Sequence, residues 1–266
     1  MPLAVCATPI GNLDDVTLRV LEELREAEVV LAEDTRHTRG LLERHGIRAE
    51  LLSYHEHNEA ARTAELLPRL EAGERVALVT DAGMPLVSDP GARLVRAALD
   101  AGVPVTVLPG PSAVETALVA SGLGGGPYAF VGFLPRKAGE LDALWRTTAE
   151  WGCALVAFES PQRLAASLRS LAAFDPAREV AVCRELTKRF EEVLRGRADE
   201  VASRFPEPPK GEITLVVAPG VATVDVDAAV AAVGELVAAG APRGVAAEVV
   251  ARLTGVARND LYRRTL

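Results

Sequence analysis

The sequence predicts an α/β fold in which at least the first half is built on a parallel or mostly parallel sheet. Apolar runs at residues 3–7, 29–32, 76–79 and 103–108 have the length of buried strands, and stretches with helical spacing lie between them. Strands that alternate with helices are typical of βαβ units. A glycine-rich stretch at 121–127 then separates this pattern from a second half with a different arrangement of strands.

The remaining elements of the first half follow from shorter signals. Asp14 or Asp15 is placed to cap the helix that carries Val20, Leu21 and Leu24. Residues 50–53 indicate a short third strand, and the pattern over 59–70 predicts a helix. A further helix is predicted to begin at Ala92, directly after the loop that follows the strand at 76–79.

The second half predicts a mixed sheet followed by a small helical tail. Strands are expected at 128–133, 154–158, 179–183 and 211–217, whereas residues 190–195 alternate only loosely. Residues 242–244 separate two short helices, and 255–262 predict a turn and another helix, either helix-turn-helix-like or a plain hairpin. We therefore expect two α/β domains, at 1–118 and 119–222, and a tail at 223–266.

Composition restricts the possible classes of protein. The chain has 266 residues, 49% of them apolar, and a formal net charge of −8, which argues against a broad basic coat for nonspecific nucleic-acid binding. No apolar run is long enough to span a membrane, and no secretory signal is visible, so we expect a cytoplasmic protein. The three cysteines are expected to be reduced core thiols. His37, His55 and His57 lack accompanying ligands, so we expect no metal site.

The loop at residues 80–91 is the strongest candidate for a ligand site. It follows a buried strand, and ligands of open α/β sheets bind beyond the carboxyl ends of strands. It contains two acids, two prolines and two glycines but no basic residue, and it matches neither a Walker loop nor a GxGxxG fingerprint. This composition suits a cofactor with an adenosine and an amino-acid tail better than a polyphosphate. A purely structural turn is an equally open interpretation.

Polar clusters follow three further apolar strands, at residues 33–37, 159–163 and 184–189. Single members of such clusters are usually solvated or paired with each other. Three clusters together with the ligand-type loops favour a cleft lined by acids and bases.

Eight motifs occur in one order along the chain: 8–13 (TPIGNL), 32–38 (AEDTRHT), 81–83 (DAG), 88–91 (SDPG), 108–113 (LPGPSA), 132–137 (GFLPRK), 159–163 (ESPQR) and 184–188 (RELTK). As a set they resemble the bacterial 16S ribosomal RNA cytidine-2′-O-methyltransferases of the small-subunit methyltransferase I type, within the tetrapyrrole-methylase superfamily. The resemblance extends from Leu3 to about Val217 and includes the tail.

The resemblance implies two α/β domains of the tetrapyrrole-methylase type, with S-adenosylmethionine in the cleft between them. It further implies a homodimer whose substrate is a cytidine ribose of 16S rRNA in the small ribosomal subunit. The residues that it places around the cofactor are Pro9, Ile10, Asp81, Ala82, Gly83, Met84, Ser112, Ala113, Phe158, Glu212 and Ile213. Met84 departs from the threonine that is usual in the family, and Gln162 departs from histidine.

Methyl transfer to a ribose hydroxyl needs alignment and a base or nearby cation. Our candidates for catalysis are Glu33, Asp34, Glu159 and Lys188. Our candidates for RNA binding are Arg36, His37, Arg136, Lys137, Arg163 and Arg189, with Arg252, Arg258, Arg263 and Arg264 as further contacts from the tail. We expect Asp89 to cap the helix after it rather than to contact substrate.

Two alternatives to this function stay open. The same fold can act on a tetrapyrrole or a protein side chain, although the motifs at 33–38 and 184–188 argue against that. A ribosome-associated protein that binds the cofactor without turnover is the other alternative.

Overall fold

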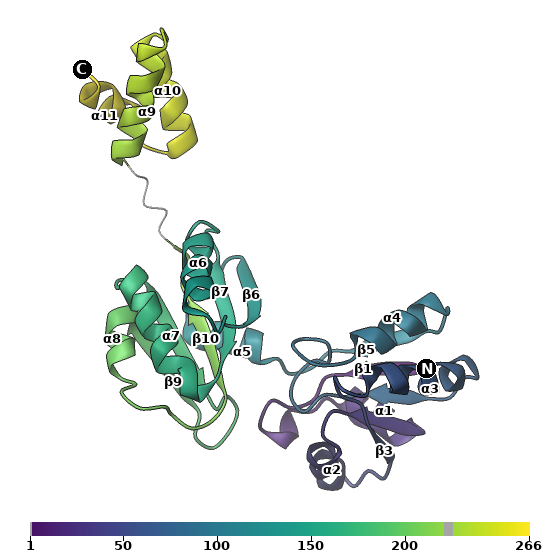
Figure 1. Ribbon diagram of the computed structural model, residues 1–266. Helices are drawn as coiled ribbons and strands as arrows, with labels where there is room; N and C mark the ends of the chain where they lie inside the picture. The colour runs from purple at the N-terminus through teal and green to yellow at the C-terminus, as the bar shows by residue number, and fades with distance from the viewer. Residues whose placement is uncertain (1, 221–225) are drawn as a thin grey trace. The chain divides into compact units, whose positions relative to one another are not determined.

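The computed structural model describes residues 2–220 and 226–266, and the chain divides into two compact units, Met1–Gly220 and Val221–Leu266. The first unit contains two five-stranded sheets, and the second contains only helices (Figure 1). Among the described residues, no helix is long and apolar enough to cross a membrane.

The first sheet is wholly parallel and has the strand order β3-β2-β4-β1-β5, as the alternation of strands and helices predicted. Parallel strands need a crossover between them, and helices supply it after β1 to β4. Its elements are β1 (Leu3–Cys6), α1 (Leu18–Glu26), β2 (Val29–Ala32), α2 (Thr35–Arg44), β3 (Glu50–Ser53), α3 (Glu59–Glu71), β4 (Val76–Leu78), α4 (Ala92–Asp100) and β5 (Val105–Leu108).

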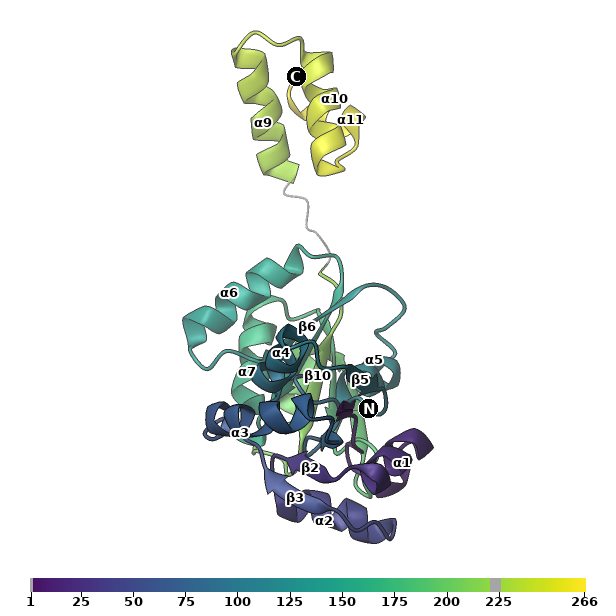
Figure 2. The same ribbon diagram turned by 90° about the vertical axis from the view of Figure 1, so that its right-hand side faces the viewer.

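Helices cover both faces of this sheet, which explains why its central strands are apolar at every position. Successive side chains of a strand point to opposite faces. Ala4 and Cys6 of β1 accordingly pack with α1 and α2, whereas Leu3 and Val5 pack with α3 and α4. Figure 2 shows α3 and α4 apart from α1 and α2. The double cover leaves the carboxyl ends of the strands as the place for a ligand.

Two predicted helix caps are wrong. The Thr17 hydroxyl caps α1 by accepting the Val20 N–H, while Asp14 and Asp15 lie in a preceding 3₁₀ turn, Leu13–Asp15. Asp89 does not cap α4, whose N-cap is Gly91. The carboxylate that accepts the N–H groups of Gly91 and Arg93, each at 3.2 Å, belongs to Glu59 at the start of α3.

The second sheet is mixed, as predicted, with the order β6-β7-β10-β8-β9, in which only the β6–β7 pair is parallel. The loosely alternating stretch forms an edge strand, β9. The elements of this half are α5 (Ala113–Ser121), β6 (Tyr128–Phe133), α6 (Ala138–Ala149), β7 (Ala154–Glu159), α7 (Pro161–Phe174), β8 (Glu179–Arg184), β9 (Glu192–Arg197), α8 (Ala198–Ser203) and β10 (Ile213–Val217).

The two faces of the second sheet have separate cores. One face packs on α6, α7 and α8, with the indole of Trp145 buried at its centre. The other packs on α5, whose Val114, Ala117 and Leu118 are buried there together with Ile10 from the loop after β1. The predicted domain boundary at residue 118 therefore falls within a helix that covers the second sheet. The loop containing Ile10 joins the first sheet to the second core.

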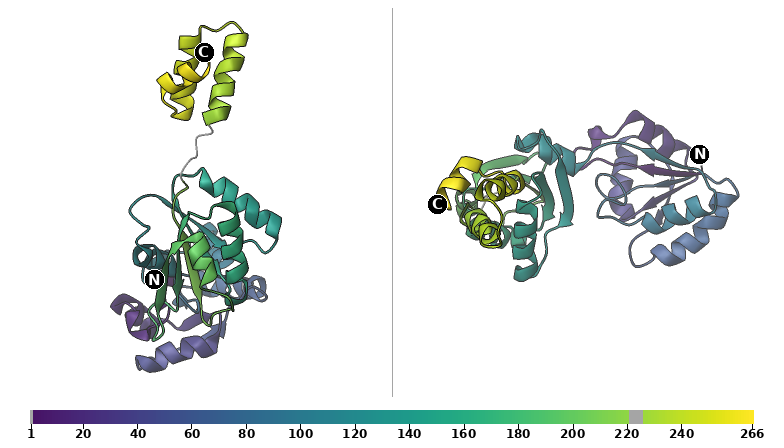
Figure 3. Two further views of the ribbon diagram at one scale, coloured as in Figure 1. Left: turned by 90° about the vertical axis from the view of Figure 1, so that its left-hand side faces the viewer. Right: turned by 90° about the horizontal axis from the view of Figure 1, so that it is seen from above.

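The unit Val221–Leu266 contains α9 (Val226–Ala238), α10 (Arg243–Thr254) and α11 (Arg258–Arg264), which pack side by side (Figures 2 and 3). Ala229, Val233, Ala247, Val250 and Leu261 form its small core. Pro242 is the N-cap of α10, which begins at Arg243 rather than after Gly244. The predicted boundary at 222/223 lies outside the described residues.

Candidate active site

A cavity of about 470 Å³ lies within the unit Met1–Gly220, and loops from both of its sheets line it. The first sheet contributes residues that follow β1, β2, β4 and β5. The second contributes the ends of β6, β7 and β8 and the start of β10. The volume is within the range of about 300–1,000 Å³ that small-molecule sites have.

The loop after β4 is tied to the loop after β1 by hydrogen bonds between main chains. The Thr8 N–H donates to the Gly83 carbonyl at 2.8 Å, and the Gly83 N–H donates to the Thr8 carbonyl at 3.0 Å. The buried Thr8 hydroxyl also donates to the Thr80 carbonyl at 2.9 Å. These bonds position Asp81, Ala82 and Met84 along one wall of the cavity.

Backbone strain gathers in two loops beside the cavity. Among the described residues, the non-glycine residues with positive φ are Leu86, Ser88, Glu185 and Thr187. The first two belong to the loop after β4 and the others to the loop after β8. A non-glycine residue in this region costs of order 1–3 kcal/mol, and such residues cluster at functional sites. The strained loops carry Ser88 and Leu186 into the cavity wall.

The residues expected around the cofactor meet in this cavity, with one exception. Pro9 is buried but is not among the lining residues, whereas all the others line the cavity: Ile10, Asp81, Ala82, Gly83, Met84, Ser112, Ala113, Phe158, Glu212 and Ile213. Met84 also packs against the core under α3 and α4. Gln162, the other departure from the family pattern, is exposed and does not line the cavity.

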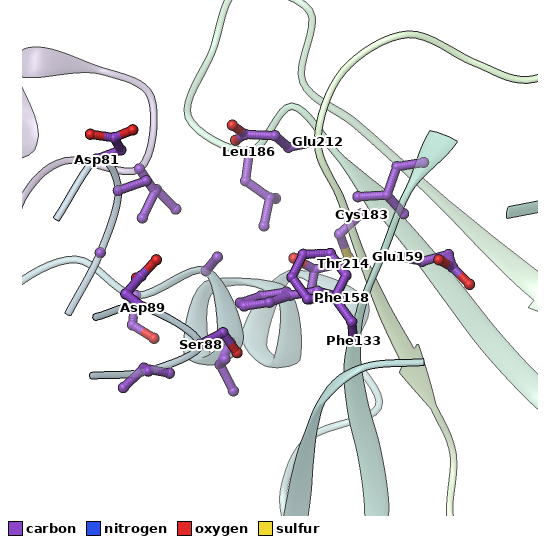
Figure 4. A pocket seen from close by; sticks show the side chains of 18 of the residues that line it. Asp81, Ser88, Asp89, Phe133, Phe158, Glu159, Cys183, Leu186, Glu212 and Thr214 are labelled. Atoms are coloured by element: carbon purple, nitrogen blue, oxygen red, sulfur yellow. The ribbon is translucent and has the colours of Figure 1, made fainter. Parts of the chain in front are cut away.

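The cavity wall has acidic residues and no basic ones. Its carboxylates come from Glu33, Asp81, Asp89, Glu159 and Glu212, and no lysine, arginine or histidine is among the described residues that line it. Figure 4 shows Asp81 and Asp89 facing Phe158 and Phe133 across open space. A pocket of this charge is unsuited to a polyphosphate and suits a cation.

Asp89 has the most strongly altered ionisation in the cavity. The pKa of its half-buried carboxyl is raised to about 6, mainly by burial and also by the negative charges of Glu33 and Asp81, while a hydrogen bond with Thr80 acts in the opposite direction. Burial and the charge of Asp81 also raise the pKa of Glu33. Asp81 accepts the Asp34 N–H at 3.0 Å. Acids whose pKa is raised toward neutrality are suited to accept a proton.

Glu159 lines the cavity, but its carboxylate is fully buried and accepts three hydrogen bonds. It accepts the Ser160 N–H at 2.7 Å, the guanidinium of Arg163 at 2.9 Å and the hydroxyl of Ser167. The same guanidinium donates to the carbonyls of Leu134 and Pro135. The pair therefore ties the ends of β7 and β6 together, and Figure 4 shows Glu159 away from the open space.

Asp34 and Lys188, the other candidates for catalysis, are not among the lining residues. Hydrogen bonds from Arg36 hold the pKa of Asp34 well below its usual range, and Asp34 also caps α2. The Lys188 ammonium lies 3.1 Å from Glu185 and 2.8 Å from Glu212. Both side chains are thus paired close to the cavity rather than inside it.

The candidates for RNA binding all lie outside the cavity wall. Arg36, His37, Arg136, Lys137 and Arg189 are exposed, and Arg163 is held by Glu159. Arg189 lies over the ring of Phe190 and borders an open hollow with Lys188 and Arg44. In the part of the chain that the structure describes, no group of three His, Cys, Asp or Glu side chains could hold a metal ion.

Several lining residues were not anticipated: Val87, Ser88, Asp89, Val114, Phe133, Cys183, Leu186 and Thr214. Four of them lie inside motifs of the sequence analysis: Ser88, Asp89, Phe133 and Leu186. The motifs placed these residues near the site, but they did not predict which side chains face the cavity. Cys183 and Thr214 were predicted only as residues of buried strands.

Comparison with known proteins agrees with this geometry. The family description "Tetrapyrrole (Corrin/Porphyrin) Methylases" matches residues 2–202. A protein of Mesorhizobium japonicum named ribosomal RNA small subunit methyltransferase I is 46% identical over 99% of this chain and 91% of its own. One of the same name from Micromonospora olivasterospora is 46% identical over 98% of this chain and 85% of its own. The chain belongs to the ribosomal RNA small subunit methyltransferase I family of tetrapyrrole methylases.

Solved structures show the same fold at lower identity. The uroporphyrin-III C-methyl transferase of Thermus thermophilus, complexed with S-adenyl homocysteine, has a TM-score of 0.56 and 22% identity, and the match covers 80% of this chain and 96% of that one. This likeness establishes the tetrapyrrole methylase fold predicted from the motifs.

Proposed function

We propose that this protein transfers a methyl group from S-adenosylmethionine to the 2′-hydroxyl of a cytidine ribose in 16S rRNA of the small ribosomal subunit. The observation that carries the proposal is the composition of the cavity. All but one of the residues expected around the cofactor line it, and no basic side chain is among the described lining residues. The family to which the chain belongs supports the choice of ribosomal RNA as the acceptor.

The lining residues fit the cofactor in shape and charge. S-adenosylmethionine is a cation at its sulfur and amino groups, and Asp81, Asp89 and Glu33 supply the negative charge to balance it. Ile10, Ala113 and Phe158 offer apolar surface for its adenosine. When bound, the cofactor supplies a methyl group that its positively charged sulfur has already activated.

The main task of the protein is then to align and deprotonate the ribose hydroxyl. We assign the proton acceptor to Asp89, with Glu33 beside it, because both carboxylates face the cavity and have raised pKa values. Asp34 and Glu159 remain candidates, but their bonds to Arg36 and Arg163 favour roles in positioning. Lys188 is similarly held between Glu185 and Glu212.

The exposed basic residues outside the cavity wall are proposed to hold RNA phosphates. Arg36, His37, Arg136, Lys137 and Arg189 lie outside the acidic wall, so phosphate groups would stay at the surface while a ribose enters. Arg163 instead positions the segment after β6. In the tail, Arg252, Arg258, Arg263 and Arg264 are proposed further contacts, which act by charge on the structured subunit.

We also propose a homodimer in the cytoplasm. Edge strand β5 carries Val107, which is 56% exposed, and an exposed apolar edge of this kind suits a second copy of the chain. Light scattering of the purified protein at several concentrations tests the dimer. A molar mass equal to that of a single chain at every protein concentration would contradict the dimer.

Two measurements separate this function from its alternatives. Purified protein and labelled S-adenosylmethionine are incubated with small subunits from cells that lack the activity, and we expect label in 16S rRNA. Label in a ribosomal protein, or only in an added tetrapyrrole, would favour the same fold with another acceptor. Calorimetry that shows cofactor binding without any transfer would favour a binding protein.

A further inference from the structure

Phe133 is an exposed aromatic ring at the wall of the candidate active site. It is 59% exposed although it lines the cavity and belongs to a strand. Leaving a phenylalanine in water forgoes most of the stabilisation that its burial would bring. Figure 4 shows Phe133 next to Phe158, on the opposite side of the open space from Asp89.

An irregularity in β6 sets the direction in which the ring of Phe133 points. Phe130 and Phe133 are three residues apart, so a regular strand would point them to opposite faces. The register of β6 against β7 shifts between these two residues. Both rings consequently contact Phe158, with centroids 4.9 Å and 5.6 Å from it and planes inclined at 65° and 64°. Bulges next to active sites commonly re-aim a side chain in this way.

Gly132 allows the irregularity. Its φ is +68°, a conformation that residues with a Cβ rarely adopt. A Cβ at this position would lie 3.7 Å from the hydroxyl of Ser88, so the strained loop of the first sheet passes close to the bulge. The ring of Phe133 thus lies where loops of the two sheets meet, braced by Phe158 but not covered.

We propose that Phe133 is the stacking platform for the base of the nucleotide that receives the methyl group. The inference rests on the proposed function and adds a substrate-binding residue to it. A ribose can reach the donor only if its nucleotide leaves the surrounding RNA stack, and proteins hold such splayed bases on aromatic rings. The acidic cavity repels phosphate, so the base and ribose are the parts of the nucleotide that fit inside.

The position of Phe133 favours the base of the RNA over the adenine of the cofactor. Phe158 and Ile10, which are more deeply placed, offer apolar surface for adenosine within the cavity. Phe133 is also followed by Arg136 and Lys137, both exposed. Among the described residues no carboxylate lies within ion-pairing distance of Arg136, whereas Lys137 lies 2.9 Å from Glu140. A base on Phe133 would therefore have the Arg136 guanidinium, three residues along the chain, for a neighbouring phosphate.

The test compares Phe133→Ala, Phe133→Leu and Phe133→Trp with the wild type, and Phe174→Ala, at the exposed end of α7, is the matched control. The readouts are KM and kcat for methyl transfer to small subunits, and the Kd of S-adenosylmethionine by calorimetry. Base stacking of this kind is worth about 5- to 150-fold per base. We expect KM to rise by a factor in this range for Phe133→Ala and Phe133→Leu, and to stay within about threefold for Phe133→Trp.

Leucine keeps the apolar volume but not the planar ring, so wild-type KM in Phe133→Leu would overturn the stacking platform. A matching loss of cofactor affinity in Phe133→Ala would overturn it too and assign the ring to adenine. A small subunit that lacks the base at the methylated nucleotide completes a double-mutant cycle. With this substrate, the KM of Phe133→Ala should equal that of the wild type. If the wild type itself transfers no methyl group to small subunits, the proposed function fails rather than the platform.

Discussion

The structure gives Asp89 a different place from the one predicted from the sequence. Its place in a Ser-Asp-Pro-Gly turn before a helix is typical of a cap, but Glu59 caps that helix from α3. Asp89 is left in the cavity beside Glu33 and Asp81, and this raises its pKa to about 6. The folded state therefore binds the proton of Asp89 more tightly than the unfolded state does, and ionising this group destabilises the fold.

The first prediction concerns Asp89→Asn. Because an amide cannot accept the proton, methyl transfer should fall by about 10²- to 10⁴-fold. Above pH 6 the variant should be more stable than the wild type by about 1 kcal/mol, allowing for the half-exposed carboxyl. That difference should shrink as pH falls from about 6 toward 4, where the wild type becomes protonated in both states. Thermal unfolding at pH 7.5 and pH 4, with kcat at pH 7.5, checks both effects.

Glu22→Gln, at an exposed position of α1, is the control and should change neither quantity. Wild-type activity should also rise with pH through about 6, as Asp89 ionises. Full activity in Asp89→Asn would remove it as the proton acceptor and return the role to Glu33, Asp34 or Glu159.

At the scale of elements, the ends of the strands make the site. The carboxyl-terminal ends of six strands, the bulge of β6 and the start of β10 meet at one cavity. The ion pair between buried Glu159 and partly exposed Arg163 ties β7 to the segment after β6. Glu159 is the fully buried partner of this pair, so its hydrogen bonds are the part of the pair that holds the fold together.

The second prediction is that Glu159→Ala destabilises the unit Met1–Gly220 by about 2 kcal/mol, since it removes a buried carboxylate that accepts hydrogen bonds from Ser160, Arg163 and Ser167. Cofactor affinity should fall as well, because Ser160 and Pro161 line the cavity. Urea unfolding and calorimetry measure the two effects. An unchanged urea midpoint would show that the pair is not structural, and Asp199→Ala, which breaks the exposed pair with Arg197, is the control.

Much of this arrangement was predictable from the sequence, for reasons that particular elements show. The apolar runs of β1, β2 and β4 indicated strands buried on both faces, and their parallel order follows from the helices between them. Asp81 and Ile10 were expected around the cofactor because the motifs that contain them resemble those of the family. The cap by Glu59 and the bulge at Gly132 depend on contacts between distant segments, and no local pattern reveals them.

At the scale of the whole molecule, the chain divides into two compact units. Every residue that lines the cavity belongs to Met1–Gly220, and the last of them is Thr214. The unit Val221–Leu266 has its own small core and several exposed arginines.

The third prediction is that a chain ending at Gly220 folds and binds S-adenosylmethionine within about threefold of the full chain. If the arginines of the tail contact phosphates, its KM for small subunits should be higher and less dependent on salt, because fewer counterions are released on binding. Loss of cofactor binding on truncation would contradict this prediction. Unchanged RNA kinetics would remove the tail from the RNA interface.

The most direct test of the central claim is mass spectrometry of nucleosides from 16S rRNA after the reaction of purified protein with S-adenosylmethionine and unmethylated small subunits. We predict a cytidine with one added methyl group on its ribose, formed by the wild type and strongly reduced with Asp89→Asn. A methyl group on the base, or no methylated nucleoside at all, would contradict the account.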